Sequence, residues 1–437
     1  MSQGQIPVGV AFANAMQDRG SSHWPGGPQN RLEPIYDPIL RPRFKLKPAA
    51  KIFTIGSCFA RNIEEHLGRM GFDVPALSLS VPPEEWRPAP SIVDKFTPPS
   101  AVQEIERSLE MLRHPERIEQ IIDDLLFPTP DGRVIDLELR QFMPVSRQRA
   151  HERRRHILEV FANAFDADCV VITLGLVECW MDRVTGRAIQ EAPHALALRR
   201  ARDRFALKVL SYPEVLAATE RMVQLLIEHG RADVKILLTV SPVPFRSTFS
   251  GTDVVMANCY SKSTLRTAAQ VVYENFDQVD YFPSYEIVTM SRAPNVWMPD
   301  LMHVHPDFIA KVVDFFARDY VQASNPLADR EYRTIHTLEA SFEPHPPFAW
   351  GVTLPPALRH LTAQSGSLRR SPLRLFEDEL QLGPAHQDFQ SIAQLGGGAY
   401  TFFGAKLYFS TSDGSDPNTN GRALTVRLID GLGDEPG

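Results

Sequence analysis

The fold is decided by the stretch Lys51-Ile-Phe-Thr-Ile-Gly56-Ser57-Cys58-Phe59-Ala60, near the start of the chain. Residues 51–55 predict a buried strand, because apolar or β-branched side chains occupy four of the five positions. The next two residues turn the chain, and apolar residues then recur at helical spacing until Gly71. Ser57 therefore lies where a buried strand ends and a helix begins, at the sheet edge where ligands of α/β proteins usually bind.

Ser57 has two interpretations at this position. A serine before a helix is most often a cap, whose oxygen accepts a backbone N–H. The position also suits chemistry, because the first N–H groups of the helix lack partners within it and the helix dipole favours developing negative charge. A hydroxyl placed here could attack a carbonyl and have the oxyanion stabilised nearby. The catalytic interpretation requires a base elsewhere in the chain.

Length and composition limit the class of protein. The 437 residues exceed one ordinary hydrophobic core, so two or three domains are expected. The content of 43% hydrophobic and 23% charged residues is typical of a soluble globular protein. The net charge of −7 argues against a dedicated nucleic-acid binder.

The four cysteines, Cys58, Cys169, Cys179 and Cys259, include no C-x-x-C pair. They predict neither a disulfide framework nor a zinc site, and a reducing compartment is the simplest inference. The first twenty residues lack a basic start followed by an apolar run, and no stretch has the apolar length of a membrane span. We expect a cytoplasmic protein without a membrane span, metal or cofactor.

Strands and helices alternate over residues 50–320. The continuous apolar runs at 169–175 and 235–240 predict strands buried on both faces of a parallel sheet, and residues 279–282 predict a short further strand. Helical spacing follows in residues 213–229, 256–274 and 306–320. This alternation predicts a doubly wound parallel α/β sheet.

The carboxyl ends of such strands share one side of the sheet, because the crossovers are right-handed. Gly56-Ser57, Gly175 and Ser241 each follow a predicted strand and should therefore lie on one rim.

Four parts are predicted along the chain. Residues 1–48 form an irregular N-terminal arm, and residues 49–322 form the α/β domain with a helical insert at about 100–165. Residues 323–371 are a proline-rich linker, and residues 372–430, with short alternating runs between turns, form a small β-rich module.

A basic run lies within the insert, from His151 to His156, and contains Arg153, Arg154 and Arg155. Such a run predicts a solvated helix face.

A base for Ser57 is found at Asp300-Leu-Met-His303, in a loop ahead of the last helix of the α/β domain. The carboxylate can orient the imidazole and stabilise its cation, and the imidazole can take the serine proton and return it to the leaving group. An Asp-x-x-His pair alone is a weak signal, but its order after the serine is that of a triad. His305 is the alternative base, and Cys58 is a rival nucleophile beside Ser57.

The residues at the turn resemble a known family. Gly56-Ser57-Cys58-Phe59-Ala60 matches letter for letter the motif that names the GSCFA domain, a branch similar to the SGNH (GDSL-like) hydrolases. The similarity spans about residues 45–320. It includes the following further stretches: Thr173-Leu-Gly175-Leu-Val-Glu178-Cys-Trp180; Leu238-Thr-Val-Ser241-Pro-Val-Pro244 with Ala257-Asn258-Cys-Tyr-Ser261-Lys262-Ser-Thr-Leu-Arg266; and Tyr281-Phe-Pro-Ser-Tyr285-Glu286.

The resemblance implies roles for the three candidate residues: Ser57 as nucleophile, His303 as base and Asp300 as the group that orients the base. SGNH relatives hydrolyse or transfer acyl esters, often on carbohydrates. The expected partner is therefore an acylated carbohydrate or another acyl donor, and the oligomeric state is left open.

The chain departs from the SGNH pattern at the oxyanion hole. Relatives usually supply donors from a Gly and from an Asn in a Gly-x-Asn-Asp block, whereas Gly175-Leu-Val177-Glu178 has Val in the Asn place. A Val side chain donates nothing, so Asn258 is the substitute candidate, with a helix cap as the alternative. Glu178 is expected either to contact a substrate hydroxyl or to pair with Lys262 or Arg266.

A second candidate ligand site lies in the β-rich module, within residues 409–422. This Asp- and Asn-rich stretch resembles a tail module of bacterial proteins associated with glycans. Its side chains could ligate Ca²⁺ or a sugar, and the alternative is a turn that satisfies its own backbone.

Two classes of function follow. The first is an SGNH-type serine esterase or O-acyltransferase that forms an acyl-enzyme at Ser57. The second is a non-catalytic glycan-binding or polysaccharide-assembly protein on the same scaffold, which Val177 favours. A nucleotide-binding function is excluded, because the chain has neither G-x-G-x-x-G after a strand nor a P-loop lysine.

Overall fold

The computed structural model describes residues 6–17, 22–24, 30–79, 82, 85, 94–139, 142–294, 296–322, 332–339, 341–362, 371, 373–378, 380–383, 387 and 389–429. The chain divides into two compact units. The first consists of Met1–Gly68 and Phe72–Val321, and the second of Arg69–Gly71 and Gln322–Gly437.

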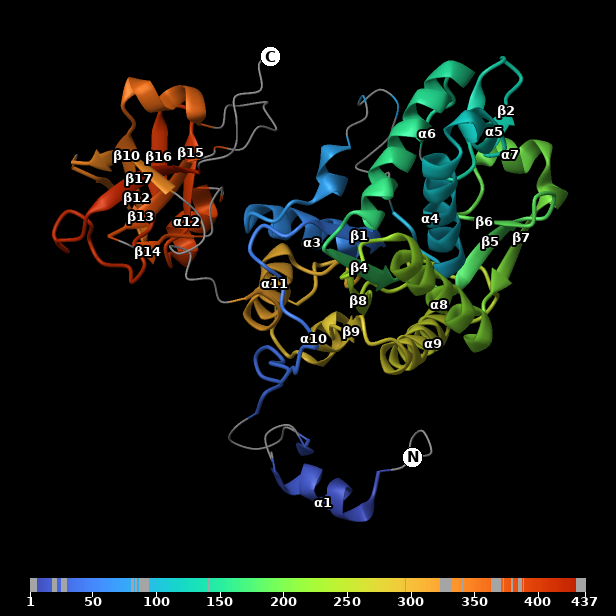
Figure 1. Cartoon of the computed structure of the whole chain (residues 1–437), viewed down its shortest axis with the longest axis horizontal. Coiled ribbons are helices and arrows are strands. Elements are labelled where there is room, and N and C mark those ends of the chain that lie inside the picture. The colour runs from blue at the N-terminus through green and yellow to red at the C-terminus, as the bar shows by residue number, and fades with distance from the viewer. Residues whose placement is uncertain are drawn as a thin grey trace. The chain divides into compact units, whose positions relative to one another are not determined.

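A four-stranded parallel sheet is the centre of the first unit (Figure 1). Its order is β1 (Ile52–Gly56), β4 (Cys169–Leu174), β8 (Lys235–Val240) and β9 (Val279–Tyr281). Every residue of β1 and β4 is buried, as expected for strands covered on both faces. The predicted α/β class and the parallel sheet are confirmed.

Helices cover both faces of this sheet (Figure 1). Alternate side chains of each strand point to opposite faces and pack into two separate apolar cores. One core is shared with α3 (Cys58–Arg69), α10 (Ser284–Met290) and α11 (Pro306–Tyr320). The other core is shared with α4 (Pro98–Arg113), α6 (Arg147–Ala162), α8 (Tyr212–His229) and α9 (Val254–Asn275).

Two parallel bridges extend the sheet beyond β1, on the edge away from β4: one joins Lys51 to Asp73, and the other joins Gly56 to Asp94. Ile52 N donates to Asp73 O at 2.8 Å, and Asp73 N donates to Ala50 O at 3.2 Å. The chain thus runs from β1 to this edge first and to β4 later. Since right-handed crossovers in opposite directions place their helices on opposite faces, this order explains why α3 lies opposite α8 and α9.

Smaller elements complete the first unit. They are α1 (Val8–Gln17), α5 (Ile118–Asp123), α7 (Ala195–Arg200), the hairpin of β2 (Leu126–Pro128) and β3 (Val134–Asp136), and an antiparallel sheet in the order β6 (Arg187–Ile189), β5 (Glu178–Asp182) and β7 (Phe205–Val209). Short 3-10 turns occupy Pro75–Ser78, Pro115–Arg117, Asn163–Phe165 and Arg202–Arg204.

The segment ahead of β1 packs on the α/β core. Phe44 and Leu46 are buried among the side chains of α3 and α11. The Arg43 guanidinium lies 3.7 Å from the centre of the Tyr273 ring, at the end of α9. These contacts fix residues 43–46 to the same unit as the sheet.

The second unit contains two four-stranded antiparallel sheets. One has the order β10 (Tyr332–Leu338), β17 (Leu424–Ile429), β13 (Leu373–Glu377) and β14 (Leu380–Gln381). The other has the order β11 (Glu343–His345), β12 (Ala349–Thr353), β16 (Lys406–Phe409) and β15 (Tyr400–Phe403). A 3-10 turn at Pro356–Leu361 and the helix α12 (Phe389–Leu395) connect strands.

The prediction of a linker over residues 323–371 is wrong in its described part, because β10, β11 and β12 lie there. The prolines of this segment suggested a linker, but Pro344 occupies the edge strand β11, where a missing N–H is tolerated.

The Asp- and Asn-rich turn of the second unit bonds its own backbone and neighbouring strand residues. Asp416 Oδ1 accepts from Asn418 N at 2.8 Å, and Arg422 pairs with Asp413 at 2.6 Å and with Glu377 at 3.1 Å. Asn420 Nδ2 donates to Ser415 Oγ at 3.0 Å. The geometry matches the expected alternative of a turn that satisfies its own backbone.

Candidate active site

The turn that carries Ser57 is shaped by close contact between β1 and β4. Gly56 has φ of +152°, and a Cβ atom there would lie 2.5 Å from the Thr173 carbonyl oxygen. Only glycine fits this position without displacing β4. Ser57 follows with 4% of its surface exposed, and its hydroxyl donates to Ser241 Oγ at 3.1 Å.

The predicted rim brings Ser57, Gly175 and Ser241 together. Ser241 N donates to Leu174 O at 2.8 Å, which holds the residue after β8 against the end of β4. Gly175 is also required, because a Cβ atom there would lie 2.6 Å from Phe96 O. The hydroxyls of Ser57 and Ser241 therefore meet beside a position without a side chain.

Lys262 joins this rim from α9. It is 1% exposed, and its Nζ donates to Gly175 O at 2.9 Å. The ammonium group thus lies directly behind the peptide that follows the predicted oxyanion glycine.

Asp300 and His303 form a hydrogen-bonded pair in the loop before α11. Asp300 Oδ2 lies 2.5 Å from His303 Nδ1, and Asp300 Oδ1 accepts from the backbone N–H groups of Met302 and His303 at 3.0 Å each. The bond with His303, helped by these two N–H groups, lowers the pKa of Asp300 to about 2. Its carboxylate is therefore ionised at neutral pH and occupies Nδ1, which leaves Nε2 as the ring nitrogen available for proton transfer.

The structure does not pair His303 with the serine in the way a resting triad does. Among the described residues, the Ser57 hydroxyl donates to Ser241, and His303 has 53% of its side chain exposed. In an unliganded site such bonds are often long or misaligned, so this arrangement leaves the predicted role of His303 open.

His305 has a structural contact instead. It is the N-cap of α11, and its Nδ1 accepts from Asp307 N at 3.3 Å. The same ring nitrogen lies 3.6 Å from the Asp307 carboxylate. Of the two candidate bases, His303 is the one oriented by a carboxylate in the Asp-x-x-His pair.

Glu178 and Asn258 both bind the loop that follows β8. Glu178 accepts from the Thr248 hydroxyl and from Phe249 N, the latter at 2.9 Å, and Arg266 pairs with Glu286 at 2.7 Å rather than with Glu178. Asn258 Oδ1 accepts from Phe245 N at 3.3 Å.

The cap alternative for Asn258 is wrong, because Asp253 is the N-cap of α9. A donor role for the Asn258 amide stays a prediction. The side chain of Cys58 lies outside the described part of the chain.

A buried polar cluster lies behind the Ser57 turn. Arg61, on the second turn of α3, pairs with Glu64 at 2.6 Å and lies 3.5 Å from Asp94. Glu64 also accepts from the Thr54 hydroxyl of β1. The cluster ties the first turns of α3 to the strand that precedes Ser57.

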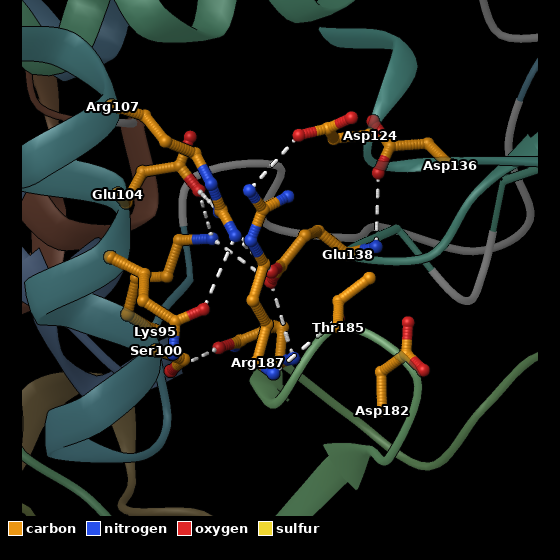
Figure 2. Close-up of polar contacts among 12 residues, drawn as sticks. Lys95, Ser100, Glu104, Arg107, Asp124, Asp136, Glu138, Asp182, Thr185 and Arg187 are labelled. Carbon is orange, nitrogen blue, oxygen red and sulfur yellow. Dashed lines mark hydrogen bonds and ion pairs between the residues drawn. The ribbon is translucent and has the colours of Figure 1, made fainter. Parts of the chain in front are cut away.

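Residues 94–97 connect this cluster to a larger ionic network (Figure 2). Lys95 N donates to Gly56 O at 2.7 Å, and its ammonium pairs with Glu104 at 2.7 Å and with Glu138 at 3.6 Å. Arg107 lies 3.3 Å from Glu104 and 3.2 Å from Glu138. Figure 2 shows these side chains converging between α4 and the neighbouring loops.

Arg154 completes the network from α6, at 3.0 Å from Glu104 and 2.6 Å from Asp136. Burial opposes ionisation of Glu104, but Lys95, Arg154 and Arg107 outweigh it and hold the pKa of this carboxyl well below its usual range. The prediction of a solvated basic face is therefore wrong for Arg153 and Arg154, which are 3% and 0% exposed. Their carboxylate partners lie far away in the sequence, where the local pattern could not reveal them.

Among the described residues, no group of three or more His, Cys, Asp or Glu side chains lies close enough together to hold a metal ion. The helices of the described ranges include none that is long and apolar enough to cross a membrane.

A sequence model of the GSCFA family matches residues 51–316. The chain belongs to the GSCFA family. No curated protein and no solved structure matches it. The matched region of this GSCFA protein begins at β1 and ends within α11, so it includes every residue of the candidate site.

The sequence predicts Ser241 on the rim without a role for it, and no pattern in the sequence points to Arg61 or Asp94 of this GSCFA protein. The Ser-Pro-x-Pro stretch after β8 was a usable signal for Ser241, because a serine that directly follows a buried parallel strand reaches the ligand edge. Arg61 and Asp94 carried no such signal, since they meet only when the chain folds.

Proposed function

We propose that this GSCFA protein is a serine esterase or O-acyltransferase acting on acylated carbohydrates. The observation that carries the proposal is the Asp300–His303 hydrogen bond. It is supported by the buried position of Ser57 directly after β1, where its hydroxyl meets that of Ser241 across the sheet rim. A bridge on the outer edge of β1 and helices on both faces also support the doubly wound, SGNH-like topology. The carbohydrate part of the proposal comes from the family resemblance.

In the proposed mechanism, Ser57 Oγ attacks the acyl carbonyl while His303 Nε2 takes the hydroxyl proton. Asp300, bound to Nδ1, stabilises the imidazolium that forms. The carbonyl bond to the leaving alcohol then breaks, and the alcohol takes the proton from His303. Water or a sugar hydroxyl attacks the acyl-enzyme in the same way and releases Ser57.

Ser241 is the proposed replacement for the oxyanion donor that Val177 cannot supply. Its hydroxyl lies 3.1 Å from Ser57 Oγ, so a small rotation would direct its proton at the oxyanion that grows beside that atom. Gly175 N–H is the second proposed donor, and the Lys262 ammonium behind it adds favourable charge.

The test is hydrolysis of p-nitrophenyl acetate by the wild type and by Ser57→Ala, His303→Asn and His305→Asn. We expect the first two variants to lose turnover. His305→Asn should retain it, because Asn still caps α11 while the imidazole is removed. Turnover that survives Ser57→Ala and His303→Asn in folded protein contradicts the triad.

The alternative function is glycan binding without catalysis. It is favoured by the resting bond of Ser57 to Ser241, which directs the hydroxyl away from a base. Binding of an acylated oligosaccharide that is equal in wild type and Ser57→Ala, with no ester turnover, would support it.

A further inference from the structure

A pocket of about 340 Å³ opens beside the rim, between the start of β5, the end of β7, the loop after β8 and the first turns of α9. Apolar side chains form much of its wall: Val177, Val209, Phe245, Met256 and Ala257. Several remain open to solvent, and the exposed fractions of Met256 and Val209 are 69% and 42%. Exposed apolar surface gathered around a concavity marks a binding site for an apolar group.

The polar groups of the pocket already have partners within the protein. Glu178 accepts from Thr248 and Phe249 N, the hydroxyls of Ser250 and Thr252 lie 2.9 Å apart, and Tyr260 donates to Leu210 O at 3.3 Å. A ligand with its own hydroxyls or charges would find few unpaired groups here, whereas an alkyl chain requires none. The lining therefore selects against a sugar ring and for a hydrocarbon chain.

The pocket lies close to the candidate active site. Val177, in its wall, is two residues beyond Gly175, a separation of at most about 7 Å along the chain. Val177 also occupies the place where SGNH relatives have a polar Asn. The same substitution that removes an oxyanion donor thus makes the wall nearest the rim apolar.

We propose that this pocket holds the aliphatic acyl chain of the ester that Ser57 attacks, so the preferred substrates carry medium-length acyl groups rather than acetyl. The assignment of the chain to an ester rests on the proposed function. The volume lies at the lower end of the range for small-molecule sites, which favours a medium chain over a long one.

The first experiment compares kcat/KM for p-nitrophenyl acetate, butyrate, hexanoate and octanoate. Each methylene that enters the pocket should raise kcat/KM about fourfold, since its burial is worth about 0.8 kcal/mol. The octanoate-to-acetate ratio should fall more than about tenfold in Ala257→Phe, whose ring fills the pocket and excludes two or more methylenes. Ala217→Phe is the matched control on an exposed position of α8, and it should leave the ratio unchanged.

The second experiment measures octanoate binding to the Ser57→Ala protein by titration calorimetry, with and without Ala257→Phe. Binding that disappears in the double variant supports the pocket even if no ester is hydrolysed, which separates this inference from the proposed function. Ester turnover with a flat chain-length profile and no octanoate binding overturns the inference. If Ala257→Phe does not fold, Val209→Glu provides the second test, because a charge at the pocket edge should also abolish octanoate binding.

A further outcome is also decisive. If the wild type is a dimer by light scattering and Ala257→Phe is a monomer, the apolar surface is an interface between copies, and the acyl-pocket assignment is overturned.

Discussion

Replacing Glu104 with Gln tests the ionic network behind the Ser57 turn. Glu104 is completely buried and lies within 2.7–3.3 Å of the Lys95, Arg107 and Arg154 cations. Together with Glu138 and Asp136, it balances three buried cations with three carboxylates. The Glu104→Gln change leaves one buried positive charge without compensation.

The expected loss of stability is about 3–5 kcal/mol, the usual cost of removing one partner from a buried ion pair. For a unit of about 320 residues, in which 1 kcal/mol corresponds to about 1.5 °C, the loss corresponds to a fall in Tm of about 4–8 °C. Glu106→Gln is the matched control on the same helix, since Glu106 pairs with Arg221 at 3.1 Å where both side chains are more than 40% exposed. A surface pair of this kind contributes about 0–1 kcal/mol.

The pH dependence gives an independent check of the same reasoning. The folded-state pKa of Glu104 is lowered, so its ionisation contributes stability that is fully present above the ordinary value of 4.5 and is lost as the pH falls below it. The difference in Tm between wild type and Glu104→Gln should therefore be largest near neutral pH and shrink on acidification. Thermal unfolding followed by circular dichroism measures both quantities. A loss no larger than that of Glu106→Gln, or a difference independent of pH, would refute the argument.

Three further predictions concern the rim and the base. Gly56→Ala should destabilise the protein by about 2–4 kcal/mol in urea unfolding, because the new Cβ would lie 2.5 Å from Thr173 O at a φ of +152°. The control is Gly186→Ala, which should cost only about 1 kcal/mol, because Gly186 has a φ of +70° but open space around it. Ser241→Ala should lower the kcat of ester hydrolysis about 10²–10³-fold with little change in KM if its hydroxyl stabilises the oxyanion, whereas an unchanged kcat would remove it from the mechanism. Asp300→Asn should lower kcat by about 10²–10⁴-fold at every pH above about 3, because the Asp300 carboxylate, with a pKa near 2, is ionised throughout that range. A loss of kcat that is confined to low pH would contradict the orienting role of Asp300.

The parts of the fold that depend on local pattern were predictable. The strand at 235–240 is confirmed at both ends, and the run at 169–175 forms a strand as far as Leu174, since a continuous apolar run between polar turns has few other solutions. The sheet of β5, β6 and β7 was missed, because each of these short strands contains a charged residue and none forms a continuous apolar run.

The candidate site was predictable to a similar degree. The Asp300–His303 contact joins residues that are three positions apart, so the spacing in the sequence predicted it. The contacts of Glu178 and Asn258 with the loop after β8 span 70 and 13 residues, and the local sequence around each residue gave no sign of them. The sequence suggested a substrate contact or an ion pair for Glu178 and an oxyanion donor or a helix cap for Asn258, whereas in the fold both side chains bind the loop that forms one wall of the apolar pocket.

The segment 94–97 connects the stability of the protein to the geometry of its candidate site. Lys95 N binds Gly56 O, and Phe96 O accepts from Leu176 N at 2.7 Å, so the same short segment contacts the peptides beside Ser57 and Gly175. Within this segment, Lys95 is the residue whose charge enters the buried ionic network, where its ammonium group pairs with Glu104 and Glu138. A network with three cations and three carboxylates can be replaced in many proteins by apolar residues without loss of stability. Its use here is better explained by position, since ion pairs with directed hydrogen bonds fix Lys95 and Phe96 between two strand ends. A shift of about 1 Å there would separate the proposed nucleophile, Ser57, from its proposed oxyanion donors. Glu104→Gln should therefore reduce kcat for ester hydrolysis even at temperatures where the variant is fully folded, whereas Glu106→Gln should not.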